Sequence, residues 1–342
     1  MTIQPTDPTT ALANAARLSV APMMDWTDRH CRMFHRVLSR RALLYTEMVA
    51  APALVRGRAL HLLDHSPAEH PVALQLGGSD PAELAEATAL GWQAGYREIN
   101  LNCGCPSDRV QSGCFGAILM QDASLVGRIV AAMIAASPAE VTVKCRIGID
   151  DQDAPSTLPR FLDTIASAGV RRVIIHARKA WLQGLSPKEN REIPPLDYDL
   201  VLAMKDRFAG LHVSINGGVE SLDQAQALLG QGMDGVMIGR AAYHRPADIL
   251  AQADARIFGD LRPPLTGPEV VAALSPYIAD ELARGTRLPA ITRHMLGLFT
   301  GQPGAKAWRR VLSETAHHRG AGLDVVDAAL DAQAQAAFAL QA

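Results

Sequence analysis

The residue of this sequence best placed to do chemistry is a thiol, Cys105, which follows a short apolar run. The segment that begins at residue 98 reads Glu-Ile-Asn-Leu-Asn-Cys-Gly-Cys-Pro-Ser. A buried strand is predicted to stop at Gly104, because Pro106 has no N–H for a strand hydrogen bond. In a repeating strand–helix protein, side chains at that point face the ligand crevice. We therefore interpret Cys105 as a group for proton or nucleophile chemistry, although many free cysteines are only small buried side chains.

Polar or glycine residues follow most of the other apolar runs at the same relative position. Taken alone, each has an ordinary explanation, since a single histidine is usually structural and a glycine pair usually marks a turn. Their recurrence after seven of eight runs predicts one shared ligand site at the carboxyl ends of the strands. The candidates in chain order are Pro22, Met23, Met24, Gln75, Asn102, Lys144, His176, Asn216, Gly217, Gly218, Gly239 and Arg240.

Two of these loops have the composition of a phosphate site. Gly217, Gly218 and Gly239 expose backbone N–H groups to a close ligand, and Arg240 adds a charged, forked donor. Strand–helix barrels commonly hold a phosphate in the loops after their last two strands. Lys144 lies inside a predicted strand, where a lysine is costly to bury without a negative partner. An anionic ligand would meet both needs.

A flavin mononucleotide (FMN) is a ligand with these properties. Its phosphate suits the glycine loops, and Lys144 could stabilise the negative charge of its reduced ring. The Gln75 amide can both donate to and accept from the pyrimidine edge of that ring. An apolar, polarisable wall for the ring is expected from Pro22, Met23 and Met24.

Eight short apolar or β-branched runs must position these residues, and they alternate with helical patterns. This alternation predicts a parallel sheet, and eight units in about 240 residues match a closed (β/α)₈ barrel, the TIM barrel. An open doubly wound sheet is the alternative, but no G-x-G-x-x-G fingerprint follows the first run. The expected strands cover residues 18–21, 42–46, 72–76, 98–101, 142–146, 172–176, 212–215 and 235–238. The expected helices cover residues 28–39, 81–94, 124–136, 157–168, 198–208, 221–231 and 246–255.

Beyond the barrel the pattern changes. Residues 260–268 are rich in proline and predict a linker, after which helices are expected at 269–284, 289–299, 304–316 and 323–340. We therefore predict an α/β protein with a flexible extension at 1–16, a TIM barrel at 17–260 and a small all-helical C-terminal domain at 261–342. The stretch 284–320 holds seven basic residues against one acid, which favours a surface that binds phosphates.

Composition narrows the class of protein. Hydrophobic residues at 48% and charged residues at 20% are typical of a globular enzyme, and the net charge of −2 indicates no general affinity for nucleic acid. No apolar run is long enough to span a membrane, and residues 1–15 lack the features of a secretion signal. Five cysteines without such a signal favour free thiols in a reducing cytoplasm. The pair Cys103 and Cys105 has C-x-C spacing and no partnering cysteine or histidine pair at zinc spacing, so we expect no metal.

Three motifs are specific enough to indicate a family. They are Ala-Pro-Met-Met-Asp-Trp-Thr-Asp at 21–28, Leu-Asn-Cys-Gly-Cys-Pro-Ser-Asp-Arg-Val at 101–110 and Ile-Asn-Gly-Gly-Val at 215–219. Together they resemble the tRNA-dihydrouridine synthases, and the segments 176–181, 185–191, 294–299 and 304–310 are similar to the A subfamily in particular. The resemblance extends from about residue 18 to residue 319. One departure is Cys103, where the family would have an apolar residue such as valine.

The resemblance implies an FMN-dependent reduction of a D-loop uridine in tRNA to 5,6-dihydrouridine, at positions 20 and 20a for the A subfamily. NADPH would be the electron source, with NADH as a second candidate. The resemblance assigns contact with the flipped uridine to Asn102. It assigns FMN binding to the other strand-end candidates, namely Pro22, Met23, Met24, Gln75, Lys144, His176, Asn216, Gly217, Gly218, Gly239 and Arg240. The residues that resemble RNA contacts are Lys188, Arg191, Lys306 and Arg309.

Saturating the C5–C6 bond of uracil needs a hydride at one carbon and a proton at the other. By the resemblance, reduced flavin delivers hydride from N5 to C6 and Cys105 protonates C5. An ordinary thiol suits this role, because it is protonated at neutral pH yet acidic enough to give up its proton. A stacked base must be extruded from folded tRNA to reach the barrel mouth, and the basic helical domain would bind the tRNA phosphates.

Three other functions fit parts of this pattern. A flavin barrel acting on a small free pyrimidine would share the FMN residues but need no basic helical domain. A flavin-free barrel that binds a sugar phosphate would share the glycine loops. A non-catalytic tRNA-binding protein would give no reason for Cys105 and Lys144 to face the barrel mouth. No obligatory protein partner is indicated.

Overall fold

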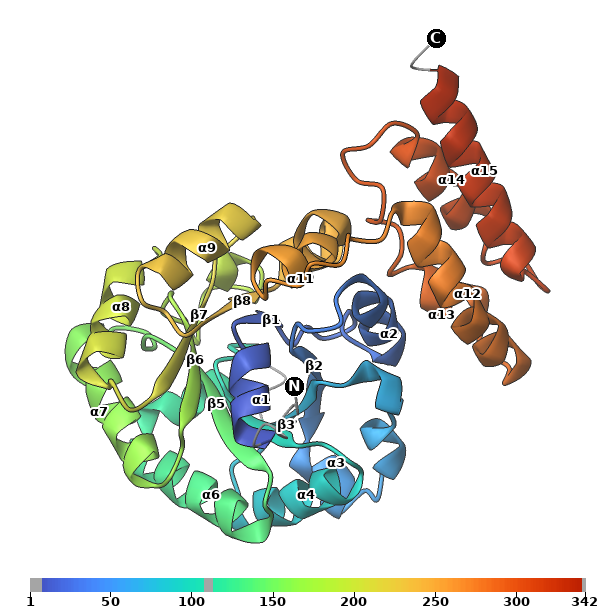
Figure 1. The fold of residues 1–342 in the computed structure, drawn as a ribbon. Helices are drawn as coiled ribbons and strands as arrows, with labels where there is room; N and C mark the ends of the chain where they lie inside the picture. Colours follow the sequence, from blue (N-terminus) through green and yellow to red (C-terminus); the bar gives the residue numbers. More distant parts are fainter. Residues whose placement is uncertain (1–7, 108–112, 340–342) are drawn as a thin grey trace, which may run out of the picture.

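Eight parallel strands form a closed barrel in the computed structural model, which describes residues 8–107 and 113–339 (Figure 1). The strands pair in the order β1-β8-β7-β6-β5-β4-β3-β2. The two ends of this sheet meet where the Val20 amide donates to the Leu43 carbonyl at 2.9 Å and the Leu43 amide donates to the Leu18 carbonyl at 3.0 Å. The predicted (β/α)₈ barrel is therefore confirmed. The strands are β1 Leu18–Val20, β2 Leu44–Ala50, β3 Val72–Gly77, β4 Glu98–Cys103, β5 Glu140–Arg146, β6 Arg172–His176, β7 His212–Asn216 and β8 Gly235–Ile238.

Helices surround the barrel and alternate with its strands (Figure 1). Their starts follow from the sequence, because Asp28, Asp80 and Asp122 each accept backbone N–H groups from the first turn of the helix that follows. The α-helices of this region are α2 Arg29–Leu38, α3 Ala51–Val55, α4 Pro81–Gln93, α6 Ala123–Ala136, α7 Ala154–Ser167, α8 Tyr198–Arg207, α9 Leu222–Gly230, α10 Arg240–His244 and α11 Gln252–Arg256. Short 3₁₀ turns lie at η1 Leu60–Leu63, η2 Pro67–Glu69, η3 Gly116–Gln121 and η4 Glu189–Arg191, and a π-helical turn at η5 Ala247–Ala251.

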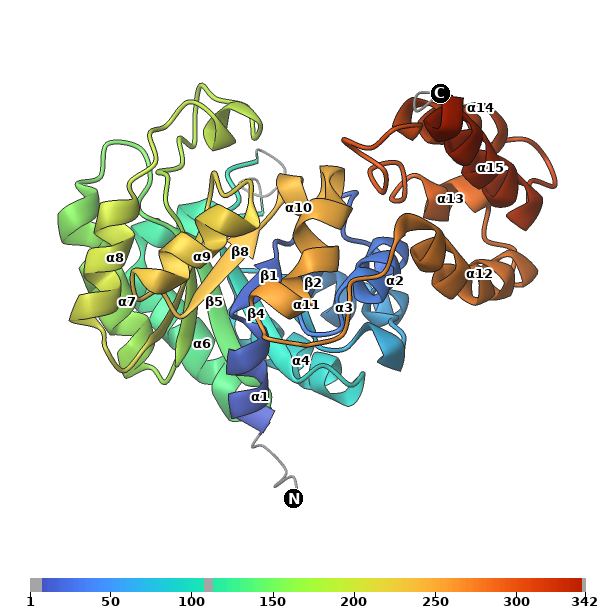
Figure 2. The same ribbon diagram turned by 45° about the horizontal axis from the view of Figure 1, so that its top comes forward.

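The segment before β1 closes the lower end of the barrel. Helix α1, Pro8–Ala15, lies at the opposite end of the barrel from α10 (Figure 2). Its Leu12 and Ala15 are buried, together with Ala16, against side chains of the barrel interior that include Leu43, Tyr45, Ala73 and Ile174. The expectation of a flexible extension was therefore wrong for residues 8–15, because apolar side chains there cover the open end of the barrel. Residues 1–7 lie outside the described part of the chain, as do Asp108, Arg109 and Val110 of the second family motif.

The inside of the barrel differs from its outside. In β4, Ile99, Leu101 and Cys103 belong to the large apolar core that extends to the surrounding helices. Glu98, Asn100 and Asn102 alternate with them and make side-chain hydrogen bonds across the barrel interior. Because of this alternation, the polar side chains of β4 lie inside the barrel, and the last of them, Asn102, lies next to the Cys105 turn.

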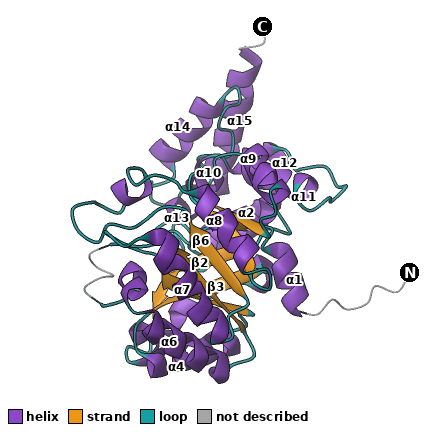
Figure 3. Ribbon diagram, turned by 90° about the vertical axis from the view of Figure 1, so that its left-hand side faces the viewer, coloured by secondary structure: helices purple, strands orange, loops and turns teal. Residues whose placement is uncertain are grey.

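The chain ends in four further helices, which stand beside the barrel (Figures 1 and 3). Ion pairs and hydrogen bonds connect them to α2: Arg29 to Glu281 at 2.8 Å, and His30 Nδ1 to the Tyr277 hydroxyl at 2.7 Å. The assignment of residues 261–342 as a separate domain stays a prediction. No helix within the described ranges is long and apolar enough to cross a membrane. The helices are α12 Gly267–Ala283, α13 Leu288–Thr292, α14 Ala305–Thr315 and α15 Leu323–Ala339.

The helix expected at 289–299 ends early. Helix α13 stops at Thr292, and turns continue to residue 301. Gly297, within those turns, lies so close to the barrel that a Cβ atom would be 2.6 Å from the His244 carbonyl oxygen. This approach of backbone to backbone favours a turn over the helix that the local apolar pattern predicts.

Candidate active site

Strand register brings the predicted site residues to one rim. Asn102 of β4 pairs with Lys144 of β5, and His176 of β6 pairs with Asn216 of β7. The Lys144 ammonium donates to the Asn216 side-chain oxygen across the barrel at 3.0 Å. The Cys105 turn follows β4 directly. The carboxyl ends of β4 to β7 therefore form a continuous polar edge, as the sequence predicted.

The turn that carries Cys105 is held by its own strand. The Asn102 side-chain oxygen accepts the backbone N–H groups of Gly104 and Cys105, each at 3.0 Å. The Cys105 carbonyl accepts the Ala117 amide at 2.9 Å, and its Sγ lies 3.5 Å from the Ser107 hydroxyl. The side chain of Cys105 is partly exposed, whereas Cys103 is fully buried. The two thiols are therefore in different environments, and only Cys105 is accessible to a ligand at the rim.

Two cations at this rim have no carboxylate partner. Burial, together with the positive charge of Arg146, lowers the pKa of Lys144 to about 8. Arg146 is 4% exposed and donates only to the carbonyl oxygens of Gly104, Lys179 and Asn190, at 2.9 to 3.1 Å. Burial lowers its pKa to about 10. Among the described residues neither cation forms an ion pair, so the rim attracts an anion.

His176 has a buried nitrogen without a partner. Its side chain is 8% exposed, and its Nδ1 makes no hydrogen bond within the described part of the structure. Burial, followed by the charges of Arg146 and Lys144, holds the pKa of His176 well below its usual value, so the ring is neutral. A buried polar atom without a hydrogen bond is costly, and a bound ligand would satisfy it.

The glycine pair after β7 is tightly packed, Gly217 against His176 and Gly218 against Leu196. Gly217 has φ +107°, and a Cβ atom there would lie 3.0 Å from the imidazole Cε1. At Gly218, with φ +69°, a Cβ atom would lie 2.5 Å from the Leu196 side chain. The Tyr198 hydroxyl donates to the Gly217 carbonyl at 2.5 Å and holds the loop in place. Both positions therefore require glycine for conformation and for space.

The remaining predicted FMN residues differ in their exposure and in the partners they already have. Met24 is 52% exposed at the mouth, and Pro22 and Met23 are partly exposed. Gln75 is 1% exposed, and both ends of its amide already have partners inside the barrel. Arg240 is not a free cation, since its guanidinium lies 2.6 Å from the Glu192 carboxylate at the surface. FMN contacts of these residues, of Asn216 and of Gly239 stay predictions.

The four residues predicted to contact RNA lie on the surface of the protein. Lys188, Arg191, Lys306 and Arg309 are all exposed; the first two lie at η4 beside the rim, and the last two on α14. In Figure 2, α14 lies on the same side of the molecule as α10, which follows the carboxyl end of β8. Their role in RNA binding stays a prediction.

Other basic residues of the stretch 284–320 have structural partners. Arg293 forms an ion pair with Asp28, and the buried His294 lies 3.0 Å from the same carboxylate. Arg284 pairs with Glu281 at 3.0 Å. Arg293 and His294 therefore attach the C-terminal helices to the barrel, whereas Arg284, at the C-terminal end of α12, pairs with that same helix.

Sequence reasoning missed Arg146 and gave Arg178 no role. Arg146 stands two positions after Lys144 on the same strand and so faces the same way, which is a signal the sequence contained. Arg178 donates to the carbonyl oxygens of Glu192 and Pro194, and its buried Nε has no partner among the described residues. No sequence signal marked Arg178 beyond its place after β6.

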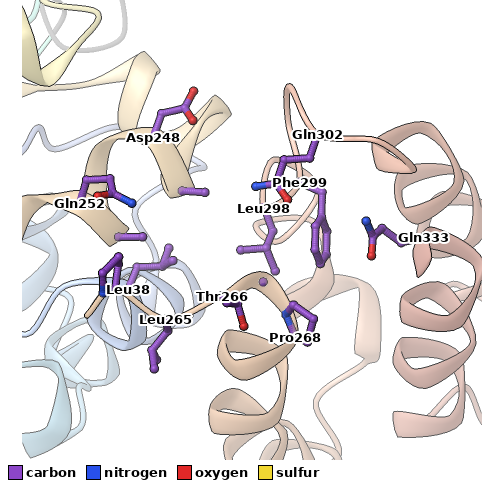
Figure 4. Close-up of a pocket in the computed structure, with 14 residues that line it drawn as sticks. Leu38, Asp248, Gln252, Leu265, Thr266, Pro268, Leu298, Phe299, Gln302 and Gln333 are labelled. Atoms are coloured by element: carbon purple, nitrogen blue, oxygen red, sulfur yellow. The ribbon is translucent and has the colours of Figure 1, made fainter. Parts of the chain in front are cut away.

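A separate groove of about 500 Å³ lies between the barrel and the C-terminal helices (Figure 4). Leu38, Gln252, Thr266, Phe299 and Gln333 are among the side chains that line it. None of the rim residues contributes to this groove, so its size does not mark the chemical site. No group of three or more His, Cys, Asp or Glu side chains is placed to hold a metal ion in residues 8–107 and 113–339.

Fold and rim together define a TIM barrel with cationic side chains at the carboxyl ends of its strands. Among solved structures, an old yellow enzyme homologue from Zymomonas mobilis has the same fold, with a TM-score of 0.51 and 10% sequence identity over 72% of this chain and 89% of its own. That likeness supports the barrel architecture alone.

Sequence comparison identifies the family. The model of the dihydrouridine synthase (Dus) family matches residues 19–337, so this chain belongs to that enzyme family and the predicted resemblance is confirmed. Similar proteins named tRNA-dihydrouridine(20/20a) synthase occur in Xanthomonas axonopodis pv. citri, at 54% identity over 93% of this chain and 94% of that protein, and in Vibrio cholerae, at 55% over 93% and 97%. The protein of that name from Escherichia coli K12 is 58% identical over 92% of this chain and 91% of its own length.

Proposed function

We propose that this enzyme binds FMN at the barrel rim and reduces uridines 20 and 20a of tRNA to 5,6-dihydrouridine, with NADPH as the electron source. The names of its relatives support the substrate and the two positions. The geometric observation that carries the proposal is the buried Nδ1 of His176, which has no hydrogen-bond partner among the described residues, on the same rim as Lys144 and Cys105. Function in the cytoplasm, where tRNA is modified, is part of the proposal.

The residues present fit FMN. A neutral His176 can donate or accept at its buried Nδ1, and Lys144 and Arg146 supply positive charge that no described carboxylate neutralises. Gly217 and Gly218 leave room at the loop where phosphate binding is expected. When bound, reduced FMN would supply the hydride for C6 of the uracil ring. The other residues proposed to hold it are Pro22, Met23, Met24, Gln75, Asn216, Gly239 and Arg240.

Cys105 is proposed to supply the proton for C5. Its turn is fixed by Asn102, and its thiol is partly exposed at the rim, as a general acid must be. Asn102 donates one amide hydrogen to Gln75 and retains a second for a carbonyl oxygen of the uracil. Negative charge that develops on that oxygen would be stabilised by this donor and by the nearby cation of Lys144.

Binding of the tRNA is proposed to use both basic surfaces. The base must be extruded from its stack, which costs a few kcal/mol that phosphate contacts offset. Lys188 and Arg191 at η4 would hold the tRNA near the rim, and Lys306 and Arg309 on α14 would hold it farther away. A small free pyrimidine would need neither surface.

The proposal is tested with the purified protein, by its bound chromophore and by its activity on tRNA. It is expected to carry a yellow chromophore that releases FMN on denaturation, and to form dihydrouridine in an unmodified tRNA transcript with NADPH, mapped at positions 20 and 20a. NADH and free uridine, assayed in parallel, define the reductant and exclude the free-pyrimidine alternative. A colourless protein, or a flavoprotein that reduces free uridine as fast as tRNA, would refute it.

A further inference from the structure

A column of polar side chains runs down the inside of the barrel from the Cys105 turn; we call it the polar column. Its members, from the mouth downward, are Asn102, Gln75, Asn100, Thr142 and Glu98. The Asn102 amide donates to the Gln75 amide oxygen at 3.0 Å, and the Gln75 amide donates to the Asn100 amide oxygen at 2.8 Å. The Asn100 amide donates to the Thr142 hydroxyl at 2.8 Å, and that hydroxyl donates to the Glu98 carboxylate at 2.8 Å. All five side chains are buried, none more than 8% exposed.

The lower end of the polar column sets the direction of its hydrogen bonds. The Arg172 guanidinium can only donate, and it lies 2.6 Å from the Glu98 carboxylate. Glu98 is therefore the acceptor for the Thr142 hydroxyl as well. Thr142 has one hydrogen and gives it to Glu98, so its oxygen must accept from the NH₂ group of Asn100.

The upper end requires the same direction. The backbone N–H groups of Gly104 and Cys105 can only donate, so the oxygen of the Asn102 amide must face them. The NH₂ group of Asn102 then faces Gln75, whose oxygen accepts it. Hydrogen bonds that point one way along a buried chain strengthen one another. Reversing any one amide would place two donors or two acceptors against each other.

We propose that Thr142 and Asn100 are positioning residues for the Cys105 acid. Neither residue reaches the rim, but through Gln75 their hydrogen bonds reinforce the Asn102 amide orientation that the backbone N–H groups of Gly104 and Cys105 require, and which leaves a donor for the substrate. The effect on catalysis rests on the proposed function, because the affected step is proton transfer from Cys105. The effect on the turn itself does not.

Thr142→Val tests this role, because valine has the shape of threonine but neither donates nor accepts. The matched control is Tyr45→Phe, which removes another buried hydroxyl from the same Glu98 oxygen, at 2.7 Å, without breaking the polar column. Thr142→Ser, which keeps the hydroxyl, should restore the behaviour of the wild type. If the valine variant does not fold, Asn100→Ala removes the next link and carries the test.

Two measurements are made on each variant. Hydrogen–deuterium exchange of the backbone amides of Gly104 and Cys105 should be about tenfold faster in Thr142→Val, as expected for one weakened hydrogen bond, and unchanged in Tyr45→Phe and Thr142→Ser. The kcat for dihydrouridine formation should fall about tenfold, with the KM for tRNA within about twofold. Equal exchange and equal kcat in Thr142→Val and Tyr45→Phe would overturn the proposal. If the wild type does not act on tRNA, the proposed function fails, and exchange alone still decides the positioning role.

Discussion

Replacing Gly217 by alanine should separate backbone strain from loss of the cofactor site. Gly217 has φ +107°, and an added Cβ atom would lie 3.0 to 3.3 Å from three atoms of the His176 ring. The backbone strain should cost about 1–3 kcal/mol of folding free energy. Since the Cβ meets three ring atoms, the imidazole must shift, and the proposed hydrogen bond from His176 to FMN should be weakened. That change should weaken FMN affinity by about tenfold.

Gly232 offers a matched control for this prediction. It has φ +103°, and nothing lies within 4 Å of the position of an added Cβ atom. Gly232→Ala should therefore show the same loss in the free energy of unfolding, measured with urea, without a change in FMN affinity. FMN binding is measured by quenching of flavin fluorescence as apoprotein is titrated. If Gly217→Ala binds FMN as tightly as Gly232→Ala, His176 does not form part of the cofactor site and the reasoning fails.

Three further predictions concern the acid, the RNA surface and pH. Cys105→Ala should keep FMN and bind tRNA while losing at least about a hundredfold in kcat; near wild-type turnover in a single-turnover assay would remove the thiol from the mechanism. Arg309→Glu should weaken tRNA binding about tenfold in a filter-binding assay at low salt, with NADPH oxidation unchanged, whereas the exposed Arg128→Glu on α6 should leave both intact. Burial lowers the pKa of His35 to about 3 in the folded protein. As the pH falls, the unfolded chain therefore binds a proton at this residue before the folded protein does. The free energy of unfolding should therefore fall below about pH 6.5, by up to about 1.4 kcal/mol per pH unit for this residue; a smaller slope in His35→Gln would confirm the source, and an unchanged slope would contradict it.

Local sequence determined most of the elements of this fold. Apolar runs marked all eight strands, and aspartates at the helix starts, such as Asp28, Asp80 and Asp122, marked where helices begin. These signals depend on only a few neighbouring residues, so they can be recognised in the sequence without knowledge of the fold. The Cys105 turn was predictable for the same reason, since Pro106, directly after Cys105, has no N–H to continue the strand hydrogen bonds.

Tertiary structure decided what the local pattern left open. Helix α1 closes the barrel because Leu12 meets an open end that the sequence did not show. Helix α13 stops early because Gly297 packs against the barrel. Arg293, which counted toward the basic stretch 284–320, forms an ion pair with Asp28 instead, and His294 beside it contacts the same carboxylate. In each case the deciding partner is distant in sequence.

The site shows the same division. Periodicity along β3, β4 and β5 determined that Gln75, Asn100 and Thr142 would share the inner face of a barrel. It did not determine that they would donate to one another in sequence, because their partners are 25 and 42 residues away. A hydrogen bond needs two atoms within about 3 Å, and only the register of neighbouring strands sets that distance. The sequence alone determined which residues line the barrel, and barrel closure decided which of them touch.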